Sequence, residues 1–508
     1  MQKIVHVPLD ERPCNYDFPK EMFQGSEFDI IRVPFEYMGL KKKPGNIEKI
    51  KSFLLKECQD AYALIVAIDT MVYGGIVPSR LHYFTLQEVL ERLYLLKEIK
   101  RINPKIKIYA YNLVMRCPRY DDDDEEPFYY QYFGYAIHMK KALEHKIMAN
   151  VATKEEIEEY NSYIIPDEYV NDYSSRREIN TALTCEAVKL VYENIIDFLI
   201  VPQDDSAPFG YTALDQMKVR GITTKYHLED KVLTYPGADE VSNTLFARML
   251  NEYYHKKPLI YVKYPSDASK NVIPCAEDRP LDISVRYQII AAGALLTTSL
   301  KEADLVLAIN APSSSMCSIG FEEYADYHSY VVGRNLLDFV EFIKYCLSIN
   351  KPVTICDIGY ANGADKALVS LIDSNDLYMS LAGYASWNIP CNSLGTAIPM
   401  GIKYIYPHDK KKFDDFLMHR FVEDILYCGL SRTILRKKYC NESTGFTIYD
   451  TKGQRNETFL SFTKKVLEEN LNEFTPHLKN RFKILDMYFP WSRTYEIGLK
   501  VEAVEKNG

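Results

Sequence analysis

Short apolar runs alternate with polar loops and amphipathic segments along most of the chain. Ten runs have the length and composition of buried strands, and they occupy residues 4–7, 28–33, 61–68, 106–111, 198–201, 231–235, 259–262, 305–309, 353–356 and 381–385. Leucine and valine recur at helical spacing over residues 85–101, and a long helix is predicted over residues 283–298. Strands that alternate with helices predict an α/β protein with parallel strands.

Two architectures fit this alternation. The first is a (β/α)8-type barrel with insertions, because omitting residues 28–33 and 259–262 as extra strands leaves eight. Residues 1–405 would then form one catalytic α/β domain, and residues 406–508, which are charged and helical in pattern, would form a mostly helical C-terminal region. The alternative is two doubly wound parallel-sheet domains, roughly residues 1–250 and 251–405.

An insertion of about residues 120–196 interrupts the strand and helix pattern. It opens with the acidic run Asp121–Glu126 and continues through helical, tyrosine-rich sequence. Acidic residues favour the amino-terminal end of a helix, so we expect the run to be a solvated helix start, with cation binding as the alternative.

The segment FLIVPQDDSAPFG, residues 198–210, is the centre of the functional prediction. Its apolar run ends at Pro202, and two adjacent carboxylates, Asp204 and Asp205, follow before residues that break the backbone. Ligands bind at the carboxyl ends of parallel strands, and two adjacent acids push their pKa values apart, as acid–base chemistry requires. The alternative is that the aspartate pair caps the next helix or holds a turn.

Other strand ends carry the same chemistry. Polar residues follow nine of the predicted strands, namely Asp10, Asp69, Asn112, Asp204, Asp239, Asp267, Asn310, Asp357 and Asn388. Asp and Asn are common turn residues, but nine in succession are harder to assign to turns alone. If the strands are parallel, these side chains gather on one face of the sheet or barrel.

Such a face favours a hydroxyl-rich ligand such as a sugar over a phosphate, because carboxylates and amides bond hydroxyls and arginines are few. Trp387 is expected to stack on a pyranose ring, and its alternative role is that of a core tryptophan at the rim. The predicted substrate-binding residues are Asp10, Arg12, Asn15, Asp69, Tyr73, Arg80, Asn112, Arg116, Asp239, Glu240, Asn310, Asp357, Asn362, Asp365, Trp387, Asn388 and Asn392.

Composition narrows the class further. The 508 residues carry a net charge of −9, which gives no basic field for nucleic acid, and no apolar stretch is long enough to span a membrane. The eleven cysteines form no CxxC pair and no zinc-finger spacing, so we expect reduced thiols in a cytoplasmic protein. No cofactor is predicted, since phosphate-binding motifs are absent. A divalent cation is expected only under the alternative in which Asp10, Asp69, Asp204, Asp205 and Asp357 are its ligands.

Seven motifs resemble a bacterial family known as domain of unknown function 4127. They are PLDERPCN (8–15), DTMVYGGIVPSR (69–80), PQDDSAPFG (202–210), PGADE (236–240), DIGYANGAD (357–365), SWNIPCNSLGTA (386–397) and FPWSRTYE (489–496). Together they span nearly the whole chain. The last motif, with Trp491, Arg493 and Glu496, is expected either to fold over the site or to anchor the helical tail.

A second, more distant resemblance concerns activity. An Asp-Asp pair after a strand, followed much later by a Trp-Asn loop, looks like the substrate-assisted β-N-acetylglucosaminidases, which are (β/α)8 barrels. The matching residues are Asp204 and Asp205 for the pair and Trp387, Asn388, Pro390 and Asn392 for the loop. The resemblance implies that Asp204 orients the substrate acetamide, whose oxygen attacks the anomeric carbon, and that Asp205 is the general acid and base.

The leading hypothesis is therefore a glycoside hydrolase, specifically an exo-acting β-N-acetylhexosaminidase with a small saccharide or glycoside as substrate. Another carboxylate arrangement would pair one of these aspartates with Asp239 or Glu240. Two other classes stay open: a metal-dependent hydrolase or lyase with Asp ligands, and a non-catalytic sugar-binding protein. No oligomeric state is predicted.

Overall fold

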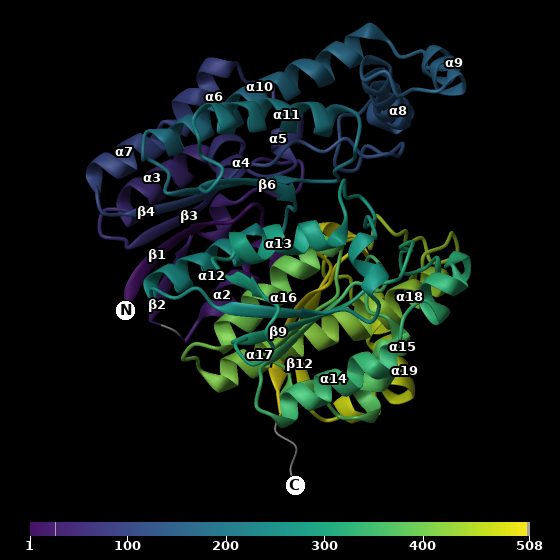
Figure 1. The fold of residues 1–508 in the computed structure, drawn as a ribbon. Coiled ribbons are helices and arrows are strands. Elements are labelled where there is room, and N and C mark those ends of the chain that lie inside the picture. Colours follow the sequence, from purple (N-terminus) through teal and green to yellow (C-terminus); the bar gives the residue numbers. More distant parts are fainter. Residues whose placement is uncertain (26, 505–508) are drawn as a thin grey trace. The chain divides into compact units, whose positions relative to one another are not determined.

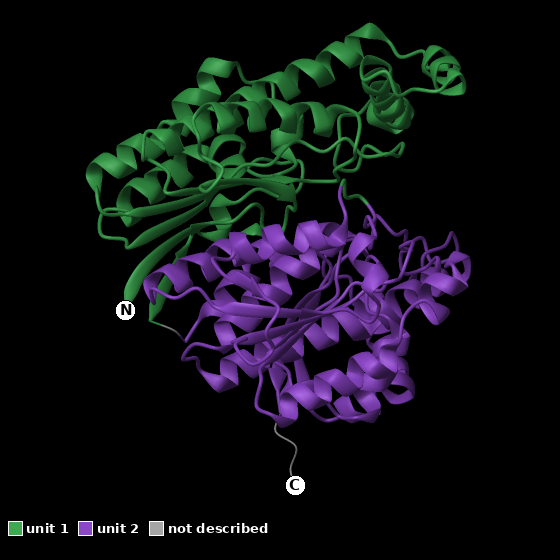
Figure 2. Ribbon diagram, in the orientation of Figure 1, with its two compact units in different colours: residues 1–11, 27–242, 276–278 green, residues 12–26, 243–275, 279–508 purple. Residues whose placement is uncertain are grey.

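The computed structural model describes residues 1–25 and 27–504, and the chain divides into two compact units (Figures 1 and 2). Unit 1 contains residues 1–11, 27–242 and 276–278. Unit 2 contains residues 12–26, 243–275 and 279–508. Each unit has a parallel sheet of its own, so each is described by itself.

Unit 1 is built on six parallel strands in the order β2-β1-β3-β4-β5-β6. Their bounds are β1 (Gln2–Val7), β2 (Phe28–Arg32), β3 (Ala63–Ala67), β4 (Lys107–Tyr111), β5 (Phe198–Gln203) and β6 (Val232–Pro236). Strands β3 and β5 are buried along their whole length, which explains their unbroken apolar sequence. Strand β1 pairs with β2 on one side and β3 on the other, so the strand order reverses direction at β1. In parallel α/β sheets, ligands bind at the carboxyl ends of the strands next to such a reversal.

The helices of unit 1 are α3 (Ile47–Glu57), α4 (Ile68–Tyr73), α5 (Pro78–Leu81), α6 (Leu86–Leu93), α7 (Leu95–Ile102), α8 (Tyr130–Met148), α9 (Lys154–Ser162), α10 (Asp167–Tyr192) and α11 (Tyr211–Lys225), with a 3-10 turn η1 (Phe35–Tyr37). The predicted insertion between β4 and β5 consists of α8, α9 and α10. Helix α10 runs beside α6 and α11 (Figure 1) and contacts β5. A cluster of Met115, Cys117, Tyr129, Tyr130 and Tyr173 forms the core that joins α8 and α10.

Unit 2 contains five parallel strands in the order β11-β10-β9-β7-β8. They are β7 (Leu259–Lys263), β8 (Leu295–Thr297), β9 (Leu305–Asn310), β10 (Val353–Asp357) and β11 (Gly383–Ala385). Read from the other edge, the order β8-β7-β9-β10-β11 repeats the winding β2-β1-β3-β4-β5 of unit 1. The two units therefore share one doubly wound plan, and strand ends in one have counterparts in the other.

Helices of unit 2 before residue 405 are α1 (Pro13–Tyr16), α2 (Phe18–Phe23), α13 (Leu281–Ala291), α14 (Leu336–Ser348), α15 (Lys366–Ser374) and α16 (Pro390–Tyr404). Helix α12 (Val241–Tyr253) begins two residues before the division at residue 243. Short helical turns are η2 (Asp267–Asn271), η3 (Glu322–Tyr324), η4 (His328–Val332) and η5 (Tyr378–Ser380).

All ten predicted runs form strands, and the chain is an α/β protein with two parallel sheets of six and five strands. Both runs that an eight-strand count omits are present as β2 and β7, and β7 lies inside its sheet between β9 and β8. The long helix predicted over 283–298 is wrong in its second half. Gly293, at φ 77, ends α13, and the chain then enters the short edge strand β8.

Residues after 405 belong to unit 2 and are mostly helical. They form α17 (Lys410–Arg420), a π-helical segment η6 (Phe421–Ser431), α18 (Arg432–Tyr439), α19 (Glu457–Phe474), the turns η7 (Pro476–Leu478) and η8 (Pro490–Ser492), and an antiparallel hairpin of β12 (Phe482–Tyr488) and β13 (Gly498–Ala503). The helical pattern did not predict the hairpin. In the part of the chain that the structure describes, no helix is both long and apolar enough to cross a membrane.

Segment η6 is buried along its whole length and holds two strand-end loops of unit 2. The Asp424 carboxylate accepts a hydrogen bond from the Ser386 backbone N–H at 2.8 Å, in the loop after β11. In the loop after β10, Gly363 has φ 155, and a Cβ atom there would lie 2.7 Å from the carbonyl carbon of Cys428. π-helical segments are rare and occur often at functional sites. Segment η6 therefore draws attention to the strand ends of unit 2 that it contacts.

Gly363→Ala is expected to lower the free energy of unfolding of unit 2 by roughly 2–5 kcal/mol, because the methyl group meets η6 backbone and the left-handed φ adds strain. Both tryptophans, Trp387 and Trp491, lie in unit 2, so urea unfolding followed by tryptophan fluorescence reports on this unit. The matched control is Gly221→Ala in α11, where no atom lies within 4 Å of the new methyl. That change should stabilise unit 1 by about 0.5–1 kcal/mol, seen by far-ultraviolet circular dichroism. An unchanged fluorescence midpoint for Gly363→Ala would refute the close approach.

Candidate functional site

The aspartate pair occupies a sharp turn at the carboxyl end of β5. Asp205 has φ 43, a left-handed conformation that non-glycine residues seldom adopt, and Gly210 at φ 106 precedes α11. The Asp204 side chain is 12% exposed, whereas the Asp205 side chain is 26% exposed. The two carboxylates therefore lie in different surroundings, one buried and the other reachable from solvent.

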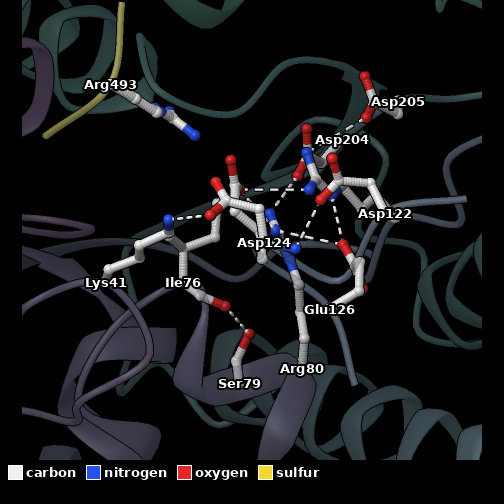
Figure 3. Close-up of polar contacts among 12 residues, drawn as sticks. Lys41, Ile76, Ser79, Arg80, Asp122, Asp124, Glu126, Asp204, Asp205 and Arg493 are labelled. Atoms are coloured by element: carbon white, nitrogen blue, oxygen red, sulfur yellow. Dashed lines mark hydrogen bonds and ion pairs between the residues drawn. The ribbon is translucent and has the colours of Figure 1, made fainter. Parts of the chain in front are cut away.

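Two arginines, both predicted as substrate-binding residues, bracket this pair. Arg80, on α5, points toward Asp204 and Glu126 (Figure 3), and its Nη2 donates to Asp204 Oδ2 at 2.8 Å. Arg116, after β4, places Nη1 3.5 Å from Asp205 Oδ2. The insertion positions Arg116, because Tyr173 and Arg177 on α10 both donate to its backbone carbonyl at 2.9 Å. The arginines thus contact the acids directly and limit how far they can move.

The acidic run completes the cluster, contrary to the expectation of a solvated helix start. Helix α8 begins only at Tyr130, and the preceding Glu125 and Glu126 fold onto the arginines. Glu126 Oε1 accepts from Arg116 Nε at 2.7 Å and lies 3.5 Å from Arg80 Nη1, while Glu125 Oε2 lies 3.0 Å from Arg80 Nη1. Fully buried Glu126 needs these partners, since an unpaired buried carboxylate is costly.

Sequence reasoning missed Glu125, Glu126 and Lys41 as parts of this cluster. Lys41 forms an ion pair with Asp124 (Figure 3), and its backbone N–H donates to Glu11 Oε1 at 2.9 Å. The sequence contained a signal for this pairing. A run of six acids that folds onto a site requires basic partners, and Arg80 and Arg116 are both predicted site residues.

Burial dominates the electrostatics of the aspartate pair. Burial and the negative charge of Asp205 together raise the pKa of Asp204 to about 7, although Arg80 and Arg116 act in the opposite direction. An acid with such a pKa is partly protonated at neutral pH, which suits it to donate a proton.

A second set of predicted residues gathers at the ends of β3 and β4. Asp69 accepts hydrogen bonds from Asn112 Nδ2 and the Leu113 backbone N–H, both at 3.0 Å. Burial raises the pKa of Asp69 to about 6, despite these bonds. The buried Tyr111 hydroxyl feels the charges of Asp10, Asp69 and Asp239, which raise its pKa together with burial. The charges of Asp10, Asp69 and Asp239 therefore all act on the Tyr111 hydroxyl, at the carboxyl end of β4.

Two further predicted residues of unit 1 have local roles. The Tyr73 hydroxyl donates to Asn180 Oδ1 at 2.7 Å, and its ring stacks on His82 at 4.5 Å between centroids, away from the aspartate pair. Glu240 Oε2 accepts from the Ala238 backbone N–H at 2.9 Å and closes the turn after β6. Each side chain therefore helps to hold the chain around it.

Among residues 1–25 and 27–504, no group of three or more His, Cys, Asp or Glu side chains is arranged to hold a metal ion. Within unit 1, Asp204 and Asp205 face Arg80 and Arg116 instead of further acids. The residues present therefore do not fit a divalent cation at the aspartate pair.

In unit 2, Asn310, Asp357 and Asp365 come together in one buried network. Asn310 Nδ2 donates to Asp357 at 2.8 Å and to Asp365 at 3.1 Å, and Arg334 forms an ion pair with Asp365 at 2.6 Å. The Tyr384 hydroxyl donates to Asp357 at 2.9 Å. Burial and the charge of Asp365 raise the pKa of Asp357 to about 7. These bonds fix the loop after β10, so the three residues brace the strand ends of unit 2.

Trp387 has the surroundings of a core tryptophan, the second of its two expected roles. Its indole N–H donates to Thr396 Oγ1 at 3.1 Å, and its ring meets Phe18 edge to face at 5.9 Å, with 6% of the residue exposed. The Asn388 carbonyl accepts from the Asn362 backbone N–H at 2.7 Å, which links the loops after β10 and β11. Asn392 is buried in α16.

The tail motif FPWSRTYE packs against Arg12 within unit 2. The guanidinium groups of Arg12 and Arg493 lie 4.5 Å and 4.4 Å from the Trp491 ring centroid, and Arg493 pairs with Glu496 at 3.1 Å. Trp491 and Ser492 both have φ 56, an uncommon strain for bulky residues. Asn15, buried in α1, lies three residues beyond Arg12. Trp491 is buried as well, so the motif is packed as an anchor.

The two halves of the distant glycosidase motif occupy equivalent places in the two units. Asp204 and Asp205 follow β5, and Trp387 and Asn388 follow β11, which is the corresponding strand of the same winding. Asp205 at φ 43 and Asn388 at φ 51 even share the left-handed turn. Likewise, Asp69 and Asn112 in unit 1 correspond to Asn310 and Asp357 in unit 2, where acid and amide are exchanged.

The predicted residues thus divide between the units. Unit 1 holds Asp10, Asp69, Tyr73, Arg80, Asn112, Arg116, Asp204, Asp205, Asp239 and Glu240. Unit 2 holds Arg12, Asn15, Asn310, Asp357, Asn362, Asp365, Trp387, Asn388 and Asn392. The aspartate pair with its two arginines is the part that combines charge, a perturbed pKa and access to solvent.

Comparison with known proteins agrees with the resemblance seen in the motifs. No curated protein matches the chain. A family model described as a protein of unknown function (DUF4127) matches residues 4–500, and this range includes both sheets and the aspartate pair. The chain therefore belongs to the DUF4127 family.

Proposed function

We propose that the chain is a glycoside hydrolase that acts from the aspartate pair, with exo-cleaved β-N-acetylhexosaminides as its first candidate substrates. The observation that carries the proposal is the buried Asp204, with a pKa raised to about 7, next to the more exposed Asp205 at the carboxyl end of β5. A buried acid with a raised pKa beside a second carboxyl group is what acid–base cleavage of a glycosidic bond can use.

The distant resemblance implies that Asp204 orients the acetamide and that Asp205 is the general acid and base. The surroundings of the two side chains favour the opposite assignment. Asp204, the protonated partner near neutral pH, gives its proton to the glycosidic oxygen while the bond to the anomeric carbon breaks. Asp205, beside Arg116, accepts a hydrogen bond from the acetamide N–H of the substrate. This bond orients the acetamido oxygen, which attacks the anomeric carbon. Asp204 then takes a proton from the water that opens the cyclic intermediate and releases the sugar.

The proposal does not require a closed (β/α)8 barrel, because ligands also bind at the carboxyl edge of doubly wound sheets. The polar strand ends around Asp69 and Asp239 offer acceptors to sugar hydroxyl groups. A cytoplasmic site of action belongs to the proposal, supported by eleven free thiols.

A panel of aryl glycosides tests this function. We expect purified protein to release the aryl alcohol from a β-N-acetylglucosaminide or N-acetylgalactosaminide faster than from the matching glucoside and galactoside. Release is followed by absorbance, with heat-inactivated protein as the control. If no glycoside in a broad panel is cleaved, the proposal fails; if sugars then raise the melting temperature without turnover, the non-catalytic sugar-binding class is favoured instead.

A further inference from the structure

One face of unit 1, away from the aspartate pair, carries an open groove over α6 and α7. Two neighbouring cavities of about 450 and 480 Å³ share Glu91 and Tyr94 in their walls. The cavity over α6 is floored by Leu86, Leu90 and Tyr94, and Leu86 remains 41% exposed. The cavity over α7 continues this floor with Leu95 and with Ile47 and Met71 from α3 and α4. Of these apolar side chains, Leu86 is exposed, Ile47, Leu90 and Tyr94 are partly exposed, and Met71 and Leu95 are buried.

The rim of this groove is acidic. Glu48, Glu88, Glu91 and Glu98 line the cavity over α7, against Lys51 and Arg92. Arg92 is turned to the protein, since its Nη1 donates to the Val72 carbonyl at 2.8 Å and its guanidinium lies 3.9 Å from the Phe84 ring centroid. The rim therefore presents excess negative charge to anything that covers the apolar floor.

We propose that this groove docks an amphipathic helix of a partner protein, with apolar residues on one face and Lys or Arg along its edges. The cavities follow one another along α6 into α7, which suits an elongated ligand that lays a stripe of apolar side chains into the floor. Basic residues at the edges would meet the glutamates of the rim, and this charge complementarity selects the partner and speeds its association. None of the residues used in the proposed hydrolysis takes part.

Fluorescence anisotropy with a labelled probe peptide tests the proposal on the full chain. The probe is a leucine–lysine peptide of about 14 residues, with leucines at helical i, i+3, i+4 and i+7 spacing. We expect saturable binding at physiological salt, weakened about tenfold or more by Glu91→Lys and several-fold by Leu86→Ala. Glu158→Lys on α9 makes the same charge change at an exposed glutamate outside the groove and should leave binding unchanged.

A scrambled peptide of identical composition separates apolar recognition from charge alone. Loss of binding with the scrambled peptide supports the groove, because only the ordered peptide forms an apolar stripe. Equal binding of both peptides, equal weakening by Glu91→Lys and Glu158→Lys, or full displacement by spermine would each overturn helix docking in favour of non-specific cation binding. Circular dichroism of each variant shows that it is folded before binding is measured.

Discussion

Asp204→Asn is expected to lower kcat/KM for the cleaved aryl glycoside by roughly 10²–10⁴-fold, because it removes the group that protonates the leaving oxygen. The amide cannot donate a proton in the same way, although it nearly preserves the shape of the side chain. Arg80 retains Glu125 and Glu126 as partners, so the fold should persist. A second substrate with a more acidic leaving group tests this role of Asp204. Such a substrate needs less protonation of its leaving oxygen, so Asp204→Asn should lower its kcat/KM by a smaller factor.

The matched control is Asp29→Asn, at an exposed position of β2 in the same unit. It should leave kcat/KM within about twofold of the unchanged protein. Asp205→Asn should also reduce kcat, but without relief from a better leaving group, because Asp205 is proposed to act on the acetamide. A fully active Asp204→Asn variant would remove Asp204 from the mechanism.

The pKa of Asp204 also sets the direction of two pH effects. Activity should decline as pH rises above about 7, since the proton that Asp204 donates is lost there. The pKa of Asp204 in the folded state lies above the ordinary aspartate value of 3.8, so the folded state binds more protons than the unfolded state between about pH 4 and 7. The free energy of unfolding therefore falls with rising pH in that window. Asp204→Asn should flatten this part of the stability curve; an unchanged slope would contradict the raised pKa.

Arg80→Met is expected to destabilise unit 1 by about 3–5 kcal/mol, the second large effect. The Arg80 side chain is 3% exposed and contacts Asp204, Glu125 and Glu126. Methionine has a similar length but no charge, so the three acids would share only Arg116 as a nearby cation. Far-ultraviolet circular dichroism follows both units, whereas tryptophan fluorescence follows unit 2, where both tryptophans lie; a transition seen only by circular dichroism therefore reports on unit 1.

Arg119→Met provides the control, since Arg119 is an exposed arginine in the same segment whose Nη2 lies 3.5 Å from the Tyr135 hydroxyl. Its effect should stay within about 0.5 kcal/mol. Combining Arg80→Met with Asp204→Asn should recover part of the loss, because the double variant leaves one fewer buried charge unpaired. A neutral Arg80→Met variant would show that the cluster does not depend on this ion pair.

Local sequence was enough to place the strands and the acids at their ends. The ten apolar runs became strands, and six of them (β3, β5, β6, β9, β10 and β11) are buried along their whole length, as a short, continuous apolar sequence between turn residues predicts. Asp204 and Asp69 were found by the same logic, since residues that directly follow a parallel strand must lie at the carboxyl edge of its sheet. The number of charged residues, by contrast, does not predict which of them form ion pairs in the folded protein.

Tertiary structure alone decided the division into two sheets and the partners of each acid. Strand order depends on pairings between residues distant in sequence, so the repeat of one winding in β1–β5 and β7–β11 leaves no local signal. For the same reason Glu126 was read as solvated, although folding buries it against Arg80 and Arg116. The sequence by itself determined which side chains reach the strand ends. Burial and long-range pairing, which follow from the packed fold, decided that the pKa of Asp204 is raised to about 7.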